Sequence, residues 1–224
     1  MIPYFKAQPI PLYGSLQLQP FGLLVGTGVL LGAWLVKKRA KEAGIPEKEI
    51  QDAIFWAVVP GFIMAHLWTV FLYHTEWLDT RGWIVALKFW EGLSSFGGFF
   101  GAFLGLAFYF TRLHKPWLKH AEIIAQGLVL GWIFGRLGCT VVHDHPGNHT
   151  DFFFAVNYPD GPRFDLGLYE FLYTLLVLFP VSLIMHHRKA RTGMFLATVV
   201  LLYTPVRFIF DFMRVDDRLE ADAR

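Results

Sequence analysis

The chain has 224 residues, of which 54% are hydrophobic, 17% aromatic and 17% charged, and its formal net charge is +2. The charged fraction is well below the roughly 25% that is typical of soluble domains. This composition excludes a linker-rich or nucleic-acid-binding protein, so no nucleic acid is expected as a partner. It indicates instead a membrane protein with a single transmembrane domain, residues 1–224. The one cysteine, Cys139, excludes an internal disulfide.

Apolar runs close to bilayer length predict about six transmembrane helices, so the expected fold is an all-α polytopic integral membrane bundle. The predicted spans lie near residues 16–36, 53–73, 94–111, 121–138, 166–185 and 193–213. Pro60 and Gly61 are expected to kink or thin the second span. The stretch 81–92 is amphipathic and too short to cross a bilayer, so a short interfacial helix is expected there.

Basic residues gather in alternate loops, and this pattern predicts how the chain is oriented in the membrane. Three loops hold the larger group: Lys37, Lys38, Arg39, Lys41, Lys48, Arg112, Lys115, Lys119, Arg188, Lys189 and Arg191. The intervening loops hold Arg81, Lys88 and Arg163, each accompanied by acidic residues. Both termini and the loop at 143–145 are therefore expected on the extracytoplasmic side.

The stretch Gly127–Gly147 combines an apolar helix with an unexpected charge. Glycines recur every four residues along this helix, which runs directly into Arg136. A charged arginine at membrane depth costs roughly 2.5–3.5 kcal/mol on insertion scales, so Arg136 indicates a functional site. The polar run that follows supplies groups able to act as acids, bases or ligands: His143, Asp144 and His145.

The last predicted helix carries a second arginine on a polar face. Tyr203, Arg207 and Asp211 are spaced at i, i+4 and i+8, and Arg214 follows three residues later. Arg207 and Asp211 could form a purely structural ion pair inside the membrane. Together with Arg136, however, Arg207 indicates a site for an anionic lipid head group, because guanidinium groups match phosphate oxygens bidentately.

Five segments, in chain order, resemble the bacterial prolipoprotein diacylglyceryl transferase family. Gly135–Gly147 reads GRLGCTVVHDHPG and is similar to the family hallmark G-R-x-G-N-F-x-N-x-E-x-x-G. Trp90–Gly101 resembles its W-x-G-G-x-S-x-H-G-G-x-x-G motif, and Leu168–Glu170 resembles its L-Y-E. Tyr203–Arg214 resembles its Y-x-x-x-R-F-x-x-E-F-x-R motif, and Gln19–Gly32 resembles its first conserved helix.

The resemblance implies a transferase of the bacterial cytoplasmic (inner) membrane, acting in lipoprotein biosynthesis. It implies transfer of diacylglyceryl from phosphatidylglycerol to the cysteine thiol of a membrane-tethered prolipoprotein peptide, with glycerol 1-phosphate released and no metal or cofactor required. Arg136 and Arg207 are the expected catalytic cations. The expected substrate-binding residues are Gly97, Gly98, Gly138, Cys139, Gly147, Tyr169, Glu170, Tyr203, Asp211 and Arg214.

This chain departs from the family pattern where protons are handled. The family histidine of H-G-G is replaced, as are an aromatic hydroxyl, two asparagines, a glutamate and an arginine; the residues here are Phe96, Phe21, Cys139, Val142, Asp144 and His66. The chain also ends soon after Arg214, where the resemblance leads one to expect a seventh helix. Phosphate binding is therefore expected to carry over better than chemistry does.

A replacement base is expected in the loop at 143–145. His143 or His145 is the candidate to take the proton of the incoming thiol, because the unperturbed pKa of histidine lies nearest to neutrality. Asp144 is the expected catalytic partner that orients the base. Alternatively, His143, Asp144 and His145 could be solvent-exposed loop residues without a catalytic role.

Other interpretations of the site stay open. His143, His145 and His149, with Asp151 close by, could hold a metal ion, although the reaction needs none. Cys139 could be a nucleophile or a small buried hydrophobe. Two alternative functions also stay open: a paralogue with the same phospholipid pocket but a different acceptor, and a non-catalytic lipid-binding membrane protein.

Overall fold

The computed structural model describes residues 1–13, 16–89, 92–114 and 117–214. Trp90 and Lys115, which enter the motif and the charge pattern above, lie outside the described residues. The chain divides into two compact units, which are described separately. Unit 1 comprises Met1–Val36 and Ala121–Arg224, and unit 2 comprises Lys37–His120.

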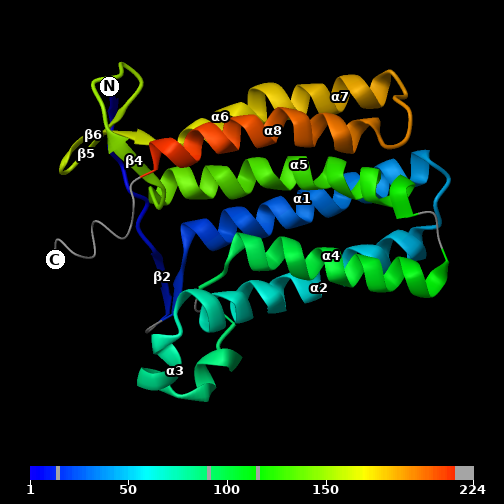
Figure 1. The fold of residues 1–224 in the computed structure, drawn as a ribbon, viewed down its shortest axis with the longest axis horizontal. Helices are drawn as coiled ribbons and strands as arrows, with labels where there is room; N and C mark the ends of the chain where they lie inside the picture. Colours follow the sequence, from blue (N-terminus) through cyan, green and yellow to red (C-terminus); the bar gives the residue numbers. More distant parts are fainter. Residues whose placement is uncertain (14–15, 90–91, 115–116, 215–224) are drawn as a thin grey trace. The chain divides into compact units, whose positions relative to one another are not determined.

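Six helices in the described part of the chain are long and apolar enough to cross a membrane, which confirms the expected polytopic helical bundle (Figure 1). Unit 2 contains α2 (Glu47–Trp68), which continues through the π-helical turn η1 (Thr69–Tyr73), and α4 (Ser95–Leu113). The other four spans are α1 (Pro20–Glu42), α5 (Trp117–Val142), the continuous run α6 (Leu166–Tyr173), η3 (Thr174–Leu178) and α7 (Phe179–His187), and α8 (Met194–Met213).

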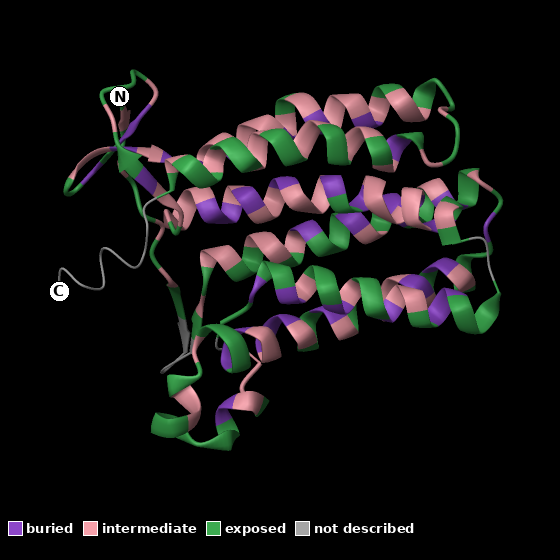
Figure 2. Cartoon of the chain, in the orientation of Figure 1, coloured by how far each residue is buried: buried purple, intermediate pink, exposed green. Residues whose placement is uncertain are grey.

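Large apolar side chains remain exposed along these helices, as the green segments of α8 illustrate in Figure 2. Leu201 is 73% exposed and Phe212 is 71% exposed on α8, and Phe103 is 67% exposed on α4. Exposed apolar surface on this scale marks an interaction with a membrane or another protein. Since it follows helices of bilayer length, it is the surface expected to face lipid.

The structure differs from the predicted spans at several ends. The first span does not begin at Leu16, because Leu16–Leu18 forms strand β3, which pairs with β2 (Ile10–Tyr13). Helix α1 begins at Pro20, where proline is tolerated because a first-turn N–H has no helical partner. No single helix covers the described part of the predicted interfacial stretch 81–92: α3 (Glu76–Arg81) ends where that stretch begins, and the 3₁₀ turn η2 (Trp83–Leu87) follows. Gly82, with φ of 71°, separates them.

A small sheet in unit 1 accompanies the helices and was not expected from the sequence. Its strand order is β1 (Ile2–Pro3), β5 (Val156–Tyr158), β6 (Gly161–Asp165) and β4 (Pro146–His149). Strand β1 is parallel to β5, and the other pairs are antiparallel. The sheet therefore brings the N-terminal segment against the loop that connects α5 to α6.

Glycines set the close helix packing in each unit. In unit 1, a Cβ atom added at Gly28 would lie 2.7 Å from the carbonyl oxygen of Gly131, so α1 and α5 touch backbone to backbone. In unit 2, a Cβ atom at Gly105 of α4 would lie 1.9 Å from the carbonyl oxygen of Trp56 on α2. Helices in lipid associate through such close van der Waals contact.

Replacing Gly105 by alanine is expected to weaken unit 2, because the added methyl group overlaps the α2 backbone rather than a flexible side chain. Overpacking of this kind costs about 1–3 kcal/mol. Thermal unfolding of the detergent-purified protein should therefore show a lower midpoint for Gly105→Ala. The matched control is Gly26→Ala, since a Cβ atom at Gly26 meets nothing within 4 Å. Equal midpoints for the two variants would contradict this packing.

Candidate active site

Glu170 is the centre of a buried charged cluster in unit 1. Its side chain lies on α6 and is only 1% exposed. Arg136 Nε, from α5, lies 2.5 Å from Glu170 Oε2, and Arg207 Nη1, from α8, donates to Oε1 at 2.7 Å. The Tyr203 hydroxyl also donates to Oε2, at 3.2 Å. Two guanidinium groups from separate helices thus converge on one carboxylate.

The neighbours of each arginine fix its orientation. The Arg136 guanidinium carbon lies 4.6 Å from the centre of the Trp132 ring, one turn earlier on α5, and this is a cation–π contact. Arg207 Nη2 lies 2.7 Å from Asp211 Oδ1, so the predicted i, i+4 pair is present. Both contacts hold the planar guanidinium groups in one orientation before any ligand arrives.

The charges of the cluster leave room for an anion. Two guanidinium groups face a single buried carboxylate, while Asp211 is 52% exposed and therefore better screened by solvent. The Arg207 side chain is itself 29% exposed, so one edge of the cluster is accessible. Each guanidinium has five N–H donors, and only some of them face Glu170. The remaining N–H groups can donate to phosphate oxygens.

His143 has a different environment from the one expected of a base. It follows the last turn of α5 with φ of 52°. Its Nδ1 lies 2.5 Å from Asp165 Oδ2, and its Nε2 lies 3.1 Å from the carbonyl oxygen of Phe5. The ring of Tyr4 stacks on it at 4.6 Å. Both ring nitrogens face acceptor oxygens of the protein, so neither is directed at a substrate.

Asp165 and Tyr158, which the sequence analysis does not single out, are the partners that hold His143. Asp165 is fully buried, caps α6 by accepting from the Leu168 N–H at 2.9 Å, and accepts from the Tyr158 hydroxyl at 3.0 Å. Burial, followed by the negative charge of Asp165, raises the pKa of Tyr158, so this hydroxyl stays protonated and donates. An aspartate just before an apolar run is a helix N-cap signal, which could have identified Asp165.

Cys139, Asp144 and His145 lie together next to Arg136. Their potential ligand atoms are all within 4.8 Å of one another. His145 Nδ1 donates to the carbonyl oxygen of Asp144 at 2.7 Å and lies 3.3 Å from Asp144 Oδ1. The Cys139 sulfur is 4.0 Å from Arg136 Nη1, so the polar run after α5 adjoins the arginine cluster.

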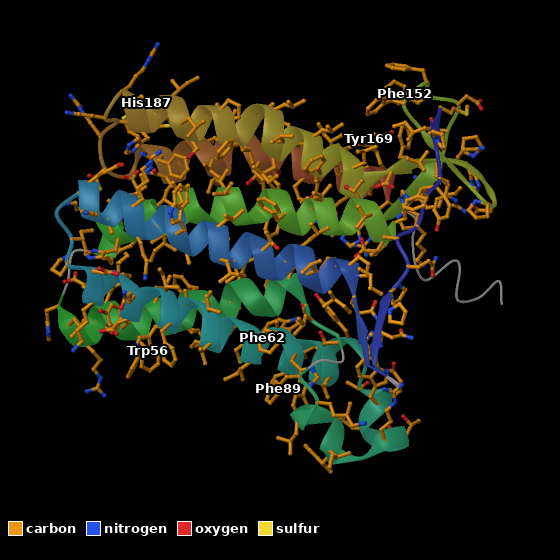
Figure 3. The ribbon with its side chains drawn as sticks, turned by 180° about the vertical axis from the view of Figure 1, so that it is seen from behind. Trp56, Phe62, Phe89, Phe152, Tyr169 and His187 are labelled. Atoms are coloured by element: carbon orange, nitrogen blue, oxygen red, sulfur yellow. The ribbon has the colours of Figure 1, made fainter. Side chains whose placement is uncertain are left out.

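Four further predicted site residues lie in unit 1. A Cβ atom at Gly138 would lie 2.9 Å from the Phe21 ring, so α1 packs closely here. Gly147 forms a bridge with Arg214, and this pairing ties β4 to the end of α8. The Tyr169 hydroxyl donates to the carbonyl oxygen of Phe154 at 3.1 Å. In Figure 3, Tyr169 lies toward the sheet end of the helical run α6–η3–α7, and His187 lies at the other end of that run.

Gly97 and Gly98 belong to unit 2, where they pack against α2. A Cβ atom at Gly97 would lie 2.4 Å from the Trp68 Cβ, and one at Gly98 would lie 3.7 Å from the Ala65 Cβ. Close packing explains both glycines, and their role in substrate binding stays a prediction. Phe96 is 60% exposed, and its ring lies 5.0 Å from that of Trp68.

The structure does not group the three histidines that the sequence offered as metal ligands. His149 Nε2 faces the carbonyl oxygen of Asp160 at 3.1 Å, and His143 is engaged with Asp165. Among the described residues, the group with metal-binding spacing is Cys139, Asp144 and His145.

The helices and this cluster together define a multi-pass membrane protein that holds two fixed arginines beside a polar run. The sequence model of the prolipoprotein diacylglyceryl transferases matches residues 9–223. The chain therefore belongs to that family, which confirms the resemblance carried by the motifs. Membership makes it an enzyme of the transferase class.

Several relatives carry the name phosphatidylglycerol–prolipoprotein diacylglyceryl transferase. The one from Chromohalobacter salexigens is 30% identical over 224 residues, which cover 97% of this chain and 83% of the relative. The one from Thermotoga petrophila is 30% identical over 217 residues, 91% of this chain and 73% of the relative. The one from Nitratidesulfovibrio vulgaris is 27% identical over 224 residues.

Proposed function

We propose that this enzyme transfers the diacylglyceryl group of phosphatidylglycerol to the cysteine thiol of a membrane-tethered prolipoprotein peptide. The observation that carries the proposal is the convergence of Arg136 and Arg207 on Glu170. The names of the relatives support the same substrates. The proposed location is the cytoplasmic (inner) membrane, with both termini and the loop at 143–145 on the extracytoplasmic side.

The arginines would stabilise the leaving group. In the transfer, the thiolate forms a bond to the carbon of the diacylglycerol unit that carries the phosphate ester. The carbon–oxygen bond to phosphate breaks, and the electron pair leaves with glycerol 1-phosphate. Preorganised cations in a dry site are the most effective way to stabilise such developing charge. Arg136 and Arg207 fill this role, and Glu170 keeps both guanidinium groups oriented before the lipid binds.

His145 is our candidate for the base that takes the proton of the thiol. Because its Nδ1 faces the acceptor oxygen of Asp144, the N–H lies on Nδ1 and the lone pair lies on Nε2. The lone pair on Nε2 can accept the proton of the thiol. Asp144 orients the ring, whereas His143 holds the N-terminal segment through Phe5.

Replacing His145 by glutamine is expected to lower kcat for lipid transfer by roughly 10²–10⁴-fold, the usual contribution of general acid–base catalysis. The measurement is the transfer of labelled diacylglyceryl from phosphatidylglycerol, by purified enzyme, to a lipobox peptide. This is a prolipoprotein peptide that carries the acceptor cysteine. The control is Phe96→Ala, which should keep most of the activity because Phe96 cannot move a proton. Activity retained by His145→Gln would reject His145 as the base.

The function itself is tested by complementation of bacterial cells depleted of their own transferase. Growth is expected when this chain is expressed and inserted in the membrane. Failure despite good membrane expression would argue against transfer to prolipoprotein. If the purified protein still binds phosphatidylglycerol, that failure would favour the paralogue with another acceptor, which the replacement of the family histidine by Phe96 also allows.

A further inference from the structure

The end of α5 gathers three side chains that are metal ligands in other proteins. Cys139 lies on the last turn of the helix, and Asp144 and His145 follow directly after it. The left-handed conformation of His143, with φ of 52°, reverses the chain at this point. As a result, Asp144 and His145 fold back toward Cys139, and their ligand atoms lie within 4.8 Å of one another. We propose that this cluster binds a divalent transition-metal ion of the Zn²⁺ class.

The combination of donors points to the class of ion. A thiolate, an imidazole nitrogen and a carboxylate oxygen are the three donor types that Zn²⁺ takes in proteins. A hard ion such as Mg²⁺ or Ca²⁺ selects oxygen ligands instead and gains nothing from a thiolate. Three protein ligands leave one position of a tetrahedral ion open for water or another ligand.

The backbone around the cluster is already fixed. The His143 N–H donates to the Cys139 carbonyl oxygen at 2.8 Å, and the Leu166 N–H donates to the His145 carbonyl oxygen at 3.1 Å. The start of α6 also packs directly on the cysteine, since a Cβ atom at Gly167 would lie 3.1 Å from the Cys139 Cβ. Ion binding therefore requires side-chain adjustment and no refolding of the loop.

The ring of His145 is prepared for a ligand role. Metal-binding histidines usually donate their second ring N–H to a carboxylate or a backbone carbonyl, and this bond fixes the ring and its tautomer. In this chain the His145 Nδ1–H has such a partner in the Asp144 carbonyl oxygen, at 2.7 Å. The tautomer leaves the lone pair on Nε2, which is the form that binds a cation.

The nearby positive charge of Arg136 opposes the binding of a cation. Its Nη1 is 4.0 Å from the Cys139 sulfur, but its Nε is paired with Glu170 at 2.5 Å. Glu170, which Arg136 shares with Arg207, therefore offsets part of the Arg136 charge. Two ligands of the cluster are anionic once ion binding displaces the Cys139 proton to solvent, so the site itself carries compensating charge.

A nitrogen that holds a cation cannot accept a proton. Ion binding at this cluster is therefore expected to compete with the base role proposed above for His145, so the cluster is also a point at which metal ions would oppose lipid transfer. This consequence rests on the proposed function, whereas the binding of the ion does not.

Titration of tag-free, metal-depleted protein in detergent with Co²⁺ tests the site, since Co²⁺ adopts the same ligands and reports thiolate ligation by a near-ultraviolet charge-transfer band. We expect this band in the wild type, its loss in Cys139→Ser, and at least a roughly tenfold weaker Co²⁺ affinity in Asp144→Asn and His145→Gln. The matched control is His149→Gln, which should bind like the wild type, because His149 faces Asp160 instead.

Absence of the charge-transfer band in correctly folded wild-type protein would overturn the proposal, and so would an unchanged band in Cys139→Ser. Thermal unfolding of each variant without metal checks its fold. If Cys139→Ser does not fold, the two variants at the exposed Asp144 and the partly exposed His145 decide the question. The titration contains neither lipid nor peptide, so its outcome is independent of the transferase reaction.

Discussion

Arg136→Ala is expected to abolish lipid transfer. The Arg136 guanidinium is buried, lies 2.5 Å from Glu170 and stacks on Trp132, so its positive charge is held in a fixed position. Loss of one preorganised charge-stabilising group costs about 10²–10³-fold in kcat, and loss of a full cation should reach at least the upper end of this range. The measurement is the transfer of labelled diacylglyceryl to a lipobox peptide at saturating phosphatidylglycerol.

Two further variants make this result specific. Arg136→Lys keeps the positive charge but loses the planar fork, so most of the activity should also be lost. Arg112→Ala removes an arginine at the end of α4, where it lies over the Phe108 ring, and should leave transfer unchanged. Nearly full activity in Arg136→Ala would remove Arg136 from the reaction.

Glu170→Gln is expected to destabilise the protein more than any surface change. The carboxylate is 1% exposed and is the shared partner of Arg136, Arg207 and Tyr203. Removing one member of a buried charged group leaves uncompensated charge and costs about 3–5 kcal/mol. The thermal unfolding midpoint of the detergent-purified variant should therefore fall well below that of the wild type.

The Glu170→Gln variant should also respond differently to lipid. Because its two arginines lack their internal anion, phosphatidylglycerol should raise its unfolding midpoint by more than it raises that of the wild type. The control is Glu76→Gln, since Glu76 is a largely exposed carboxylate paired with His74 in unit 2. A midpoint for Glu170→Gln close to that of the control would show that Glu170 does not hold the arginine pair.

The transmembrane helices could be predicted from the sequence because the hydrocarbon core of a bilayer restricts which segments can cross it. A segment that crosses a bilayer must be apolar and satisfy its own backbone hydrogen bonds, so each long apolar run is a helix. The helix ends were less accurate, because charged residues such as those at Lys37–Glu42 continue α1 beyond its apolar part. The four-stranded sheet left no signal, since its strands are only two to five residues long.

Part of the candidate site could be predicted from the sequence for a similar reason. Charged groups are costly at membrane depth, so Arg136, Arg207 and Glu170 stand out in apolar helices, and the structure places them in contact. The partners of the loop residues were not readable, because they depend on folding across the sheet. His143 contacts Asp165 at the end of β6 and the carbonyl oxygen of Phe5 in the N-terminal segment, and no local pattern specifies either contact.

The most direct measurement of the central claim, that Arg136 and Arg207 together bind the phosphodiester of a lipid, is thermal unfolding in the presence of two lipids. Phosphatidylglycerol should raise the unfolding midpoint of the wild-type protein by more than diacylglycerol, which has the same acyl chains and no phosphate. In the double variant Arg136→Gln, Arg207→Gln this difference should disappear. A difference as large in the double variant as in the wild type would contradict the claim.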